Sequence, residues 1–314
     1  MELPVSSKKF KTILGALAVF MVALVTGVAV GKLYVDSIPA NVVLDMSEEE
    51  LRDSEADVKK LVEKSKNSKP DAFSAVEVYQ IAEYNFNQKS AYYKTSDGYA
   101  KNLVGKQTLH STKILRDGEY VFDNCSPGQV EVCTRIRHTV GTDLVTRNTE
   151  GDYANAAQTK GKWNDKDNEN YTIAEYKKKF NGHPLSNITY VISSKTCPKD
   201  AISKVKKNTD GNYSFTISLS GNFLTAAAVR YSYEIFYTSY SMLSSDAKKN
   251  TILPSWKNMS MEVVVDSNFD FVSIDYDEKY VIFTGIGGPQ EVNDIFVEKF
   301  YFDLENIPTL EEVL

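Results

Sequence analysis

The chain has 314 residues, of which 42% are apolar and 25% are charged, and its 36 basic and 42 acidic side chains give a formal net charge of −6. This composition is typical of a globular protein of one or two domains and excludes a wholly disordered or collagen-like chain. The acidic balance argues against a nucleic-acid partner, because a phosphate backbone attracts a basic surface.

An apolar run without a charged side chain covers residues 12–31. As a helix rising about 1.5 Å per residue, it is long enough to cross the hydrocarbon core of a bilayer. Lysines precede the run and an acidic stretch follows Lys32, so the positive-inside rule predicts a cytoplasmic segment 1–11, a membrane helix 12–34 and an exported remainder. A cleaved signal peptide is the alternative, although its apolar region is usually shorter.

The exported part begins with helical signals. Ser47 and Glu50 have the spacing of a capping box, and acids precede lysines over 47–67, which predicts a helix there. Its few apolar positions are typical of a solvated stalk. Apolar residues at helical spacing predict the first core helix over 70–94. The predicted units after the membrane helix are a stalk (35–69), an extracellular β-rich domain (70–305) and a tail (306–314).

After Gly98 the sequence becomes rich in β-branched and aromatic residues with frequent turn signals, which predicts strands. Most gaps between the strands are too short for parallel crossovers, so we expect an α+β fold with a mainly antiparallel sheet. Alternation over 259–265 indicates one buried and one solvated face. Short helices are expected at 173–181 and 222–230. The predicted strands are 99–115, 119–124, 130–147, 188–194, 201–207, 213–219, 231–242, 259–265, 269–276, 280–284 and 295–302.

The cysteines give a limited signal. Cys125 and Cys133 flank a Ser-Pro-Gly turn, and both a disulfide across the bend and two separate thiols remain open. Cys197 has no evident partner in the sequence, and we expect a buried thiol. No cysteine follows the apolar run at its end, which excludes a lipid anchor at that point.

Motifs for catalysis are missing from the sequence. It contains no HExxH, GxSxG or SxxK motif and no glycine-rich nucleotide fingerprint. Asp266, Asn268 and Asp270 resemble the start of a calcium loop, but Phe271 occupies the position that needs glycine, so a hairpin turn is expected. An extracellular hydrolase would need its isolated histidines to converge with acidic residues in one cleft. We therefore expect no enzyme activity, no cofactor and no metal site.

Aromatic residues are concentrated in the last third of the sequence, over 231–240 and 269–302. An ordinary sheet core would account for them. The alternative is a curved sheet whose rings and aliphatic side chains surround an apolar cavity.

The order of segments AVEVYQIAEYNFNQ, RDGEYVF, TIAEYKKKFNG, ITYVISS, DGNYSFTISL, AVRYSYEIF and LPSWKNMSMEVVVDSNFDFVSIDYDEKY resembles the lipoprotein-carrier (LolA/LppX-like) superfamily and Firmicute cell-surface proteins of that shape. The resemblance covers about residues 70–303. It implies a strongly curved antiparallel sheet, an incomplete barrel, whose concave side is covered by helices and holds acyl chains or another apolar ligand. The apparent membrane anchor and the polar loop 151–170 depart from the family, so tethered binding or sensing fits better than transport over a distance.

We therefore predict a membrane-anchored bacterial protein that binds a lipid or other apolar ligand outside the cell, without catalysis. The alternative is a structural or protein-interaction module of the cell envelope with a fully packed core and a protein partner. The candidate ligand contacts, as apolar groups that shape the cavity, are Tyr231, Tyr233, Phe236, Tyr237, Val263, Val265, Phe271 and Tyr280.

Overall fold

A computed structural model of the chain describes residues 47–102, 105–126, 132–149, 163–180, 189–229, 231–232, 253–283 and 289–313. The predicted membrane segment, 12–34, lies outside these ranges and stays a prediction. Within them, no helix combines the length and the apolar character that crossing a bilayer requires.

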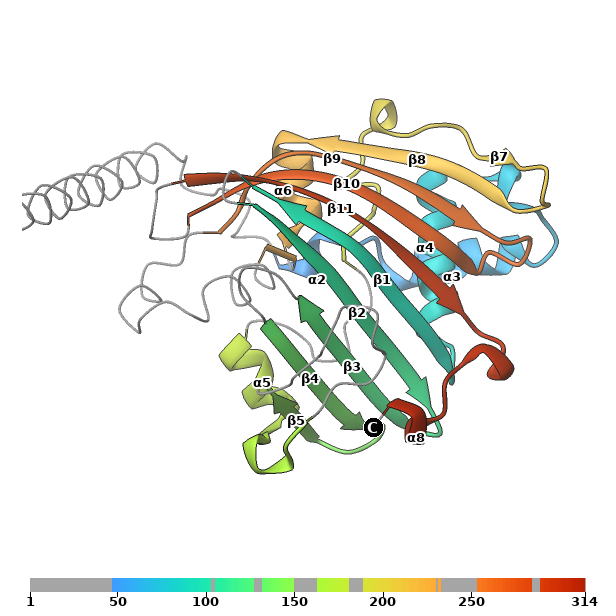
Figure 1. Cartoon of the computed structure of the whole chain (residues 1–314). Helices are drawn as coiled ribbons and strands as arrows, with labels where there is room; N and C mark the ends of the chain where they lie inside the picture. Colours follow the sequence, from blue (N-terminus) through green and yellow to red (C-terminus); the bar gives the residue numbers. More distant parts are fainter. Residues whose placement is uncertain are drawn as a thin grey trace, which may run out of the picture.

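Eleven strands form one antiparallel sheet. They are β1 (Tyr92–Lys101), β2 (Lys106–Arg116), β3 (Glu119–Ser126), β4 (Val132–Thr139), β5 (Leu144–Asn148), β6 (Glu169–Thr172), β7 (Lys206–Lys207), β8 (Tyr213–Ser220), β9 (Ser255–Val265), β10 (Phe271–Phe283) and β11 (Pro289–Tyr301). Their order in the sheet is β6-β5-β4-β3-β2-β1-β11-β10-β9-β8-β7 (Figure 1). The first and last of the described strands thus pair in the middle of the sheet, while β6 and β7 form its edges.

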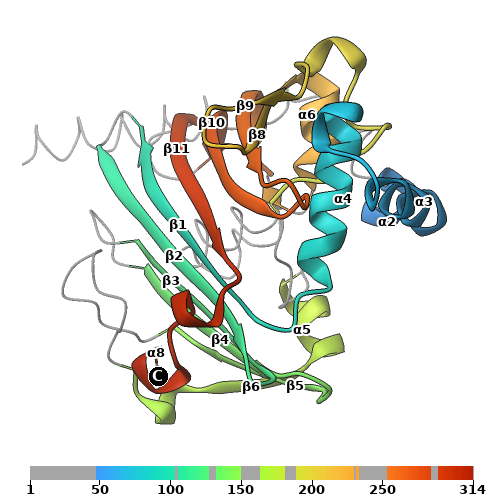
Figure 2. The same cartoon turned by 90° about the vertical axis from the view of Figure 1, so that its right-hand side faces the viewer.

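The sheet curves strongly and does not close (Figure 2), which confirms the predicted α+β class and the open, curved antiparallel sheet. Helices lie on both of its sides. On the concave side are α4 (Ala75–Asn87) and α5 (Ile173–Phe180), while α8 (Leu310–Val313) lies on the convex side (Figure 2). The other helices are α2 (Glu48–Leu51), α3 (Glu55–Ser65) and α6 (Gly221–Ala227).

The helix α4 closes the main core. Ser74 forms a capping box with Glu77, which satisfies backbone donors at the start of the helix. Beyond this cap, Tyr79 and Phe86 of α4 meet Phe271 of β10 with ring centroids 5.4 and 6.4 Å apart. Because edge-to-face contacts of this kind stabilise a core beyond the area that they bury, α4 is held firmly on the β8–β11 half of the concave face.

The convex face of β1–β4 is covered by the C-terminal segment. Ile307 and Val313 are buried against Ile114 and Val121. Arg135 donates two hydrogen bonds to Asp123, at 2.7 and 2.6 Å, and a third to the carbonyl oxygen of Val313 at 3.0 Å. The predicted tail 306–314 is therefore packed on the sheet as far as it is described.

Several predicted boundaries were wrong. The helix expected over 47–67 is two helices, because Ser54 accepts a hydrogen bond from the backbone of Asp57 and so caps a new helix. Leu51, at the end of the first helix, is 3% exposed and packs on Val191, Ala226 and Val229 rather than lying on a solvated stalk. The helix predicted over 70–94 is a short 3-10 turn followed by α4, which ends at Asn87.

The strand predictions also need correction. The segment 99–115 is divided between β1 and β2, whereas the two strands expected over 269–284 are the single strand β10. The described part of 188–194 is irregular rather than a strand, and Tyr231 is helical. The antiparallel pairing of β3 and β4 places Cys125 directly opposite Cys133, but the side chain of Cys125 is outside the described part, so the disulfide stays a prediction. Cys197 is buried, as expected.

Gly98 allows β1 and β11 to approach each other closely. A Cβ atom at this position would lie 2.2 Å from the carbonyl oxygen of Ile295 and 2.4 Å from Cβ of Phe296. Two of the three nearest atoms belong to the backbone of β11, so they cannot move aside without distorting the central strand pair.

We predict that Gly98→Ala lowers the free energy of unfolding by about 1–3 kcal/mol, the range for overpacking a filled site. Chemical denaturation followed by circular dichroism measures the change. Ser96→Ala, two residues earlier on the same strand and face, is the matched control and should change stability by less than about 0.5 kcal/mol. Equal midpoints for the wild type and Gly98→Ala would contradict the role given to Gly98.

Candidate functional site: a buried acid pair beside an open apolar strip

Four ionisable side chains lie buried on the concave face, in the middle of the sheet. Lys94 of β1, Glu278 of β10, and Asp294 and Glu298 of β11 are 2%, 0%, 3% and 4% exposed. Charged residues are almost never fully buried unless they are paired. Their presence among apolar neighbours therefore marks this part of the sheet as a candidate functional site.

Only part of this charge is balanced. The ammonium group of Lys94 lies 2.5 Å from Oε1 of Glu298. The hydroxyl of Tyr276 donates to the other oxygen of Glu298 at 3.2 Å. Glu298 is thus fully paired.

Glu278 and Asp294 lie directly opposite each other in the β10–β11 register, and we name them the acid pair. The hydroxyl of Tyr280 donates to Oδ2 of Asp294 at 2.6 Å. Oδ1 of Asp294 and both carboxyl oxygens of Glu278 have no hydrogen-bond partner of good geometry among the described residues. An unsatisfied buried polar group costs about 1–3 kcal/mol, and more when it is charged, so the pair is an unfavourable element of the fold.

Burial changes the acidity of the pair. It raises the pKa of Glu278 well above the ordinary value, and the neighbouring charge of Asp294 raises it further, against the opposing effect of the hydroxyls of Tyr190 and Tyr231. Burial also raises the pKa of Asp294 to about 7, against the opposing hydrogen bond from Tyr280. Near neutral pH the pair is therefore partly protonated, and a cation bound beside it would favour the ionised carboxylates.

Aromatic rings surround the acid pair. Trp256 of β9 lies 5.0 Å from Tyr280, 5.6 Å from Tyr231 and 6.0 Å from Tyr190, measured between ring centroids. Its indole nitrogen donates to the hydroxyl of Ser232 at 2.8 Å, which fixes the ring plane. Tyr190 also stacks on Tyr276 at 6.0 Å. We name Tyr190, Tyr231, Trp256, Tyr276 and Tyr280 the ring cluster.

Half-buried apolar side chains on the concave face of β1 to β3 adjoin this site. Three of them also pack at the margins of the cores beneath α4 and α5. The pairing of β1 with β11 sets Asp294 opposite Ala100, so the acid pair begins one strand away. We name these side chains the open strip: Ala100, Leu109, Leu115 and Phe122.

The predicted ligand contacts fall into three groups. Val263, Val265 and Phe271 are buried in the packed core beneath α4. Tyr231 and Tyr280 meet at Trp256, in the ring cluster beside the acid pair. The remaining residues, Tyr233, Phe236 and Tyr237, lie outside the described part of the chain.

Sequence reasoning missed the acid pair itself. The signal was an acid at an inward position of a period-2 pattern: Glu278 stands between Tyr276 and Tyr280, and Asp294 between Val292 and Phe296. The polar sequence around Glu278 instead predicts a break between two strands, 269–276 and 280–284. In the structure β10 continues through it with a shift of register against β9 after Lys279.

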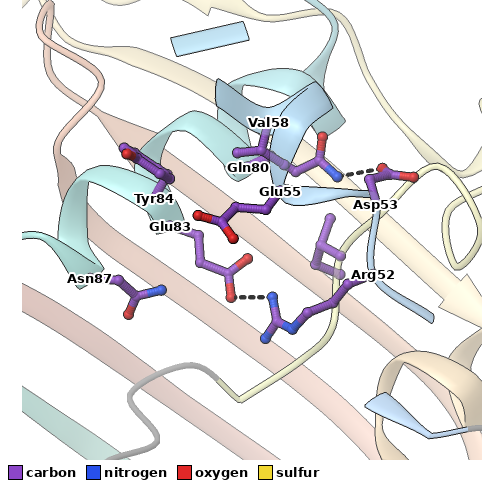
Figure 3. Close-up of a pocket in the computed structure, with 9 residues that line it drawn as sticks. Arg52, Asp53, Glu55, Val58, Gln80, Glu83, Tyr84 and Asn87 are labelled. Carbon is purple, nitrogen blue, oxygen red and sulfur yellow. Dashed lines mark hydrogen bonds and ion pairs between the residues drawn. The ribbon is translucent and has the colours of Figure 1, made fainter. Parts of the chain in front are cut away.

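A separate polar cleft of about 170 Å³ lies where α2 and α3 meet α4 (Figure 3). In it Arg52 lies 2.8 Å from Glu83 and 2.8 Å from Glu48. Asp53 accepts a hydrogen bond of 2.5 Å from Gln80 and one of 2.8 Å from the backbone of Ser194. Since these charged groups satisfy one another, the cleft serves as a joint that fixes α2 and α3 on the domain.

The histidines do not converge. Nδ1 of His110 lies 2.5 Å from a carboxyl oxygen of Asp97, and Nδ1 of His138 lies 2.9 Å from the carbonyl oxygen of Leu144. Both are hydrogen-bonded strand residues, and His183 is outside the described residues. No three His, Cys, Asp or Glu side chains are grouped as metal ligands within the described ranges. Asp266 accepts hydrogen bonds from the backbone of its own turn, so the expected hairpin is confirmed.

Comparison with known proteins gives weak similarities. No protein-family model and no curated protein matches the chain. Among solved structures it is similar to the lipoprotein LppX of Mycobacterium tuberculosis, with 9% identity over 72% of this chain and 92% of that one, at a TM-score of 0.30. A domain named for outer membrane lipoprotein sorting, from Vibrio parahaemolyticus, shares 9% identity over 76% and 95% of the two chains, at a TM-score of 0.26.

A third similar structure is a DUF1329 family protein from Desulfovibrio piger, with 8% identity over 79% of this chain and 93% of that chain and a TM-score of 0.21. The structural neighbours are LolA/LppX-like, as the sequence resemblance predicted. At these TM-scores the similarity carries no argument about ligand or activity, which must come from the residues of this chain.

We predict that Asp294→Asn weakens the pH dependence of stability. The pKa of Asp294 lies above its ordinary 3.8, at about 7, in the folded chain. Between these values the folded chain therefore binds more protons than the unfolded chain, and stability falls as the pH rises through that window, by up to about 1.4 kcal/mol per pH unit. Denaturant unfolding at a series of pH values measures the slope.

The matched control is Asp277→Asn, which removes the same charge from an exposed position next to Glu278 on β10. It should leave the slope unchanged. A slope that is the same in Asp294→Asn and in the wild type would show that Asp294 titrates normally and is not desolvated.

Proposed function

We propose that the chain is a binding protein for a lipid or another apolar ligand, which it holds against the concave face of its sheet without chemical change. The observation that carries the proposal is the open strip. Its apolar side chains are half-buried and form two groups, Ala100 with Leu109 and Leu115 with Phe122. Three of them lie at the margins of the cores beneath α4 and α5, so a ligand that covers the strip would complete their burial.

The physical basis for affinity is burial of hydrocarbon. Each methylene group that leaves water for an apolar site contributes about 0.8 kcal/mol. A chain of eight methylene groups therefore gains about 6 kcal/mol before the cost of association, which is enough for selective binding. The curvature of the sheet supports this interpretation, because a concave surface contacts a flexible chain over more of its length than a flat one.

We predict that Leu109→Lys on the open strip lowers lipid occupancy at least tenfold. A lysine there would place a charge within the apolar surface, and burying an unpaired charge costs several kcal/mol. The full chain, isolated under gentle conditions, is analysed by native mass spectrometry for bound lipid, with circular dichroism to verify that the variant folds.

Leu144→Lys is the matched control. Leu144 is 54% exposed and its neighbour Val145, not Leu144 itself, faces the α5 cluster, so the variant should retain its lipid. A wild type without any ligand would favour the alternative of an envelope module with a fully packed core. Unchanged occupancy in Leu109→Lys would place the ligand elsewhere on the chain.

We propose further that residues 12–34 anchor the protein in the cell membrane with the β-rich domain on the outer side. The support is the charge asymmetry about the apolar run, with lysines before it and acids after it. If this orientation is right, trypsin added to intact cells should cleave the domain at exposed sites such as Lys177, Lys178 and Lys206. Immunoblotting against an N-terminal tag follows the products. Protection of the full chain until the cells are lysed would contradict the orientation.

A further inference from the structure

The acid pair has a feature that lipid binding alone does not explain. A surface for hydrocarbon needs no carboxyl groups, yet Glu278 is fully buried. The hydroxyls of Tyr190 and Tyr231 lie beside it, but neither of its oxygens has a hydrogen-bond partner of good geometry among the described residues. Replacing such a group by an apolar one of similar shape would stabilise the fold. Unfavourable buried groups of this kind are frequent at binding and active sites.

The surroundings of the acid pair favour an organic cation as a ligand. The hydroxyl of Tyr280 lies at Asp294 and those of Tyr190 and Tyr231 lie at Glu278, within the packed ring cluster. Carboxyl oxygens accept hydrogen bonds from ammonium groups, and aromatic rings attract them. The described residues provide no three-ligand group for a metal ion, which makes an ammonium group the better fit.

The charges that face the site agree with this choice. Glu298 is neutralised by Lys94, the one basic side chain that forms an ion pair with these concave-face acids among the described residues. The other ionisable groups around the pair are the hydroxyls of the tyrosines in the ring cluster, whose pKa values are raised by burial where a shift is resolved. Because Lys94 is paired with Glu298, it does not balance the negative charge that the acid pair carries when it ionises.

We propose that Glu278 and Asp294 bind the positively charged head of an alkylammonium amphiphile whose hydrocarbon part lies on the open strip. The second half of this statement rests on the proposed function. The site for the charged head and the surface for the hydrocarbon chain are adjacent, because Ala100 of the open strip is directly opposite Asp294. The open strip therefore begins one strand away from the carboxyls. A ligand whose charged head lies at the acid pair reaches the strip with its hydrocarbon chain.

Binding of this kind releases protons. The pair is at least partly protonated near neutral pH, since the pKa of Asp294 is about 7 and that of Glu278 is well above the ordinary value. An ammonium head favours the ionised carboxyls, so binding and deprotonation are coupled. The affinity for an alkylammonium ion should consequently rise with pH around neutrality, by up to tenfold per pH unit for each proton released.

The test compares octylammonium with 1-octanol, which has the same alkyl chain and no charge. The full chain is reconstituted in lipid nanodiscs and titrated calorimetrically with each probe, and empty nanodiscs provide the blank. Measurements in two buffers of different ionisation enthalpy count the protons released. We expect the wild type to bind octylammonium at least tenfold more tightly than 1-octanol, with proton release.

Two variants assign the effect to the acid pair. Glu278→Gln keeps the size of the side chain and should lower the affinity for octylammonium at least tenfold while leaving that for 1-octanol within twofold. Asp294→Asn is the second variant should Glu278→Gln fail to fold. Asp277→Asn, which removes an exposed charge next to Glu278, is the matched control and should behave as the wild type.

The outcomes separate the two proposals. Equal affinities of the wild type for both probes would overturn the ammonium site and leave the apolar-ligand function standing. No binding of either probe would contradict the proposed function itself. A preference for octylammonium that persists in both Glu278→Gln and Asp294→Asn would overturn the assignment to the acid pair. A preference lost in these variants, together with proton release in the wild type, would establish it.

Discussion

The pairing of β1 with β11 is the interaction on which the rest of the structure depends. Strands β1 to β6 and strands β7 to β11 each form an antiparallel series, and this one ladder joins them into a single sheet. The ladder is tight at Gly98, where the absence of a side chain lets the backbone of β11 approach. It also brings Lys94 from one half to Glu298 of the other. Without this pairing the concave face, and with it the open strip beside the acid pair, would not exist.

The concave face combines two requirements that oppose each other. Its rings and aliphatic side chains stabilise the fold by leaving water, while its carboxyl groups lose hydration on burial. The ion pair of Lys94 and Glu298 offsets part of that loss, and the hydroxyl of Tyr280 offsets another part at Asp294. At Glu278 the nearby hydroxyls of Tyr190 and Tyr231 favour the ionised carboxylate, but burial and the charge of Asp294 outweigh them. The protein thus retains a group that reduces its own stability, at the border between its packed core and its uncovered surface.

The sequence predicts the architecture better than the site. Alternation in β9 is a local pattern and appears as expected. The turn between the strands predicted over 99–115 and 119–124 is also local, since Asp117 and Gly118 both have the positive φ of a tight hairpin. The acid pair depends on register, because a shift of one residue would turn Glu278 to the other face. Its local sequence, with Asp277 before it and Lys279 after it, is typical of a turn. The residues around the acid pair also come from distant parts of the sequence. Tyr190, for example, belongs to an irregular segment for which the sequence predicts a strand.

The central position of the first and last strands has a consequence for how the molecule forms. Strand partners such as Tyr93 and Tyr301 stand near opposite ends of the described chain. During synthesis β1 and β2 emerge early. One edge of β1 stays unpaired until β11 has been made and the hydrogen bonds between the two strands can form. Contacts between residues so distant in sequence slow folding, and an unpaired central strand is prone to aggregate. The sheet is therefore completed only after β11 has been synthesised, and until then the edge of β1 that faces β11 is without its strand partner.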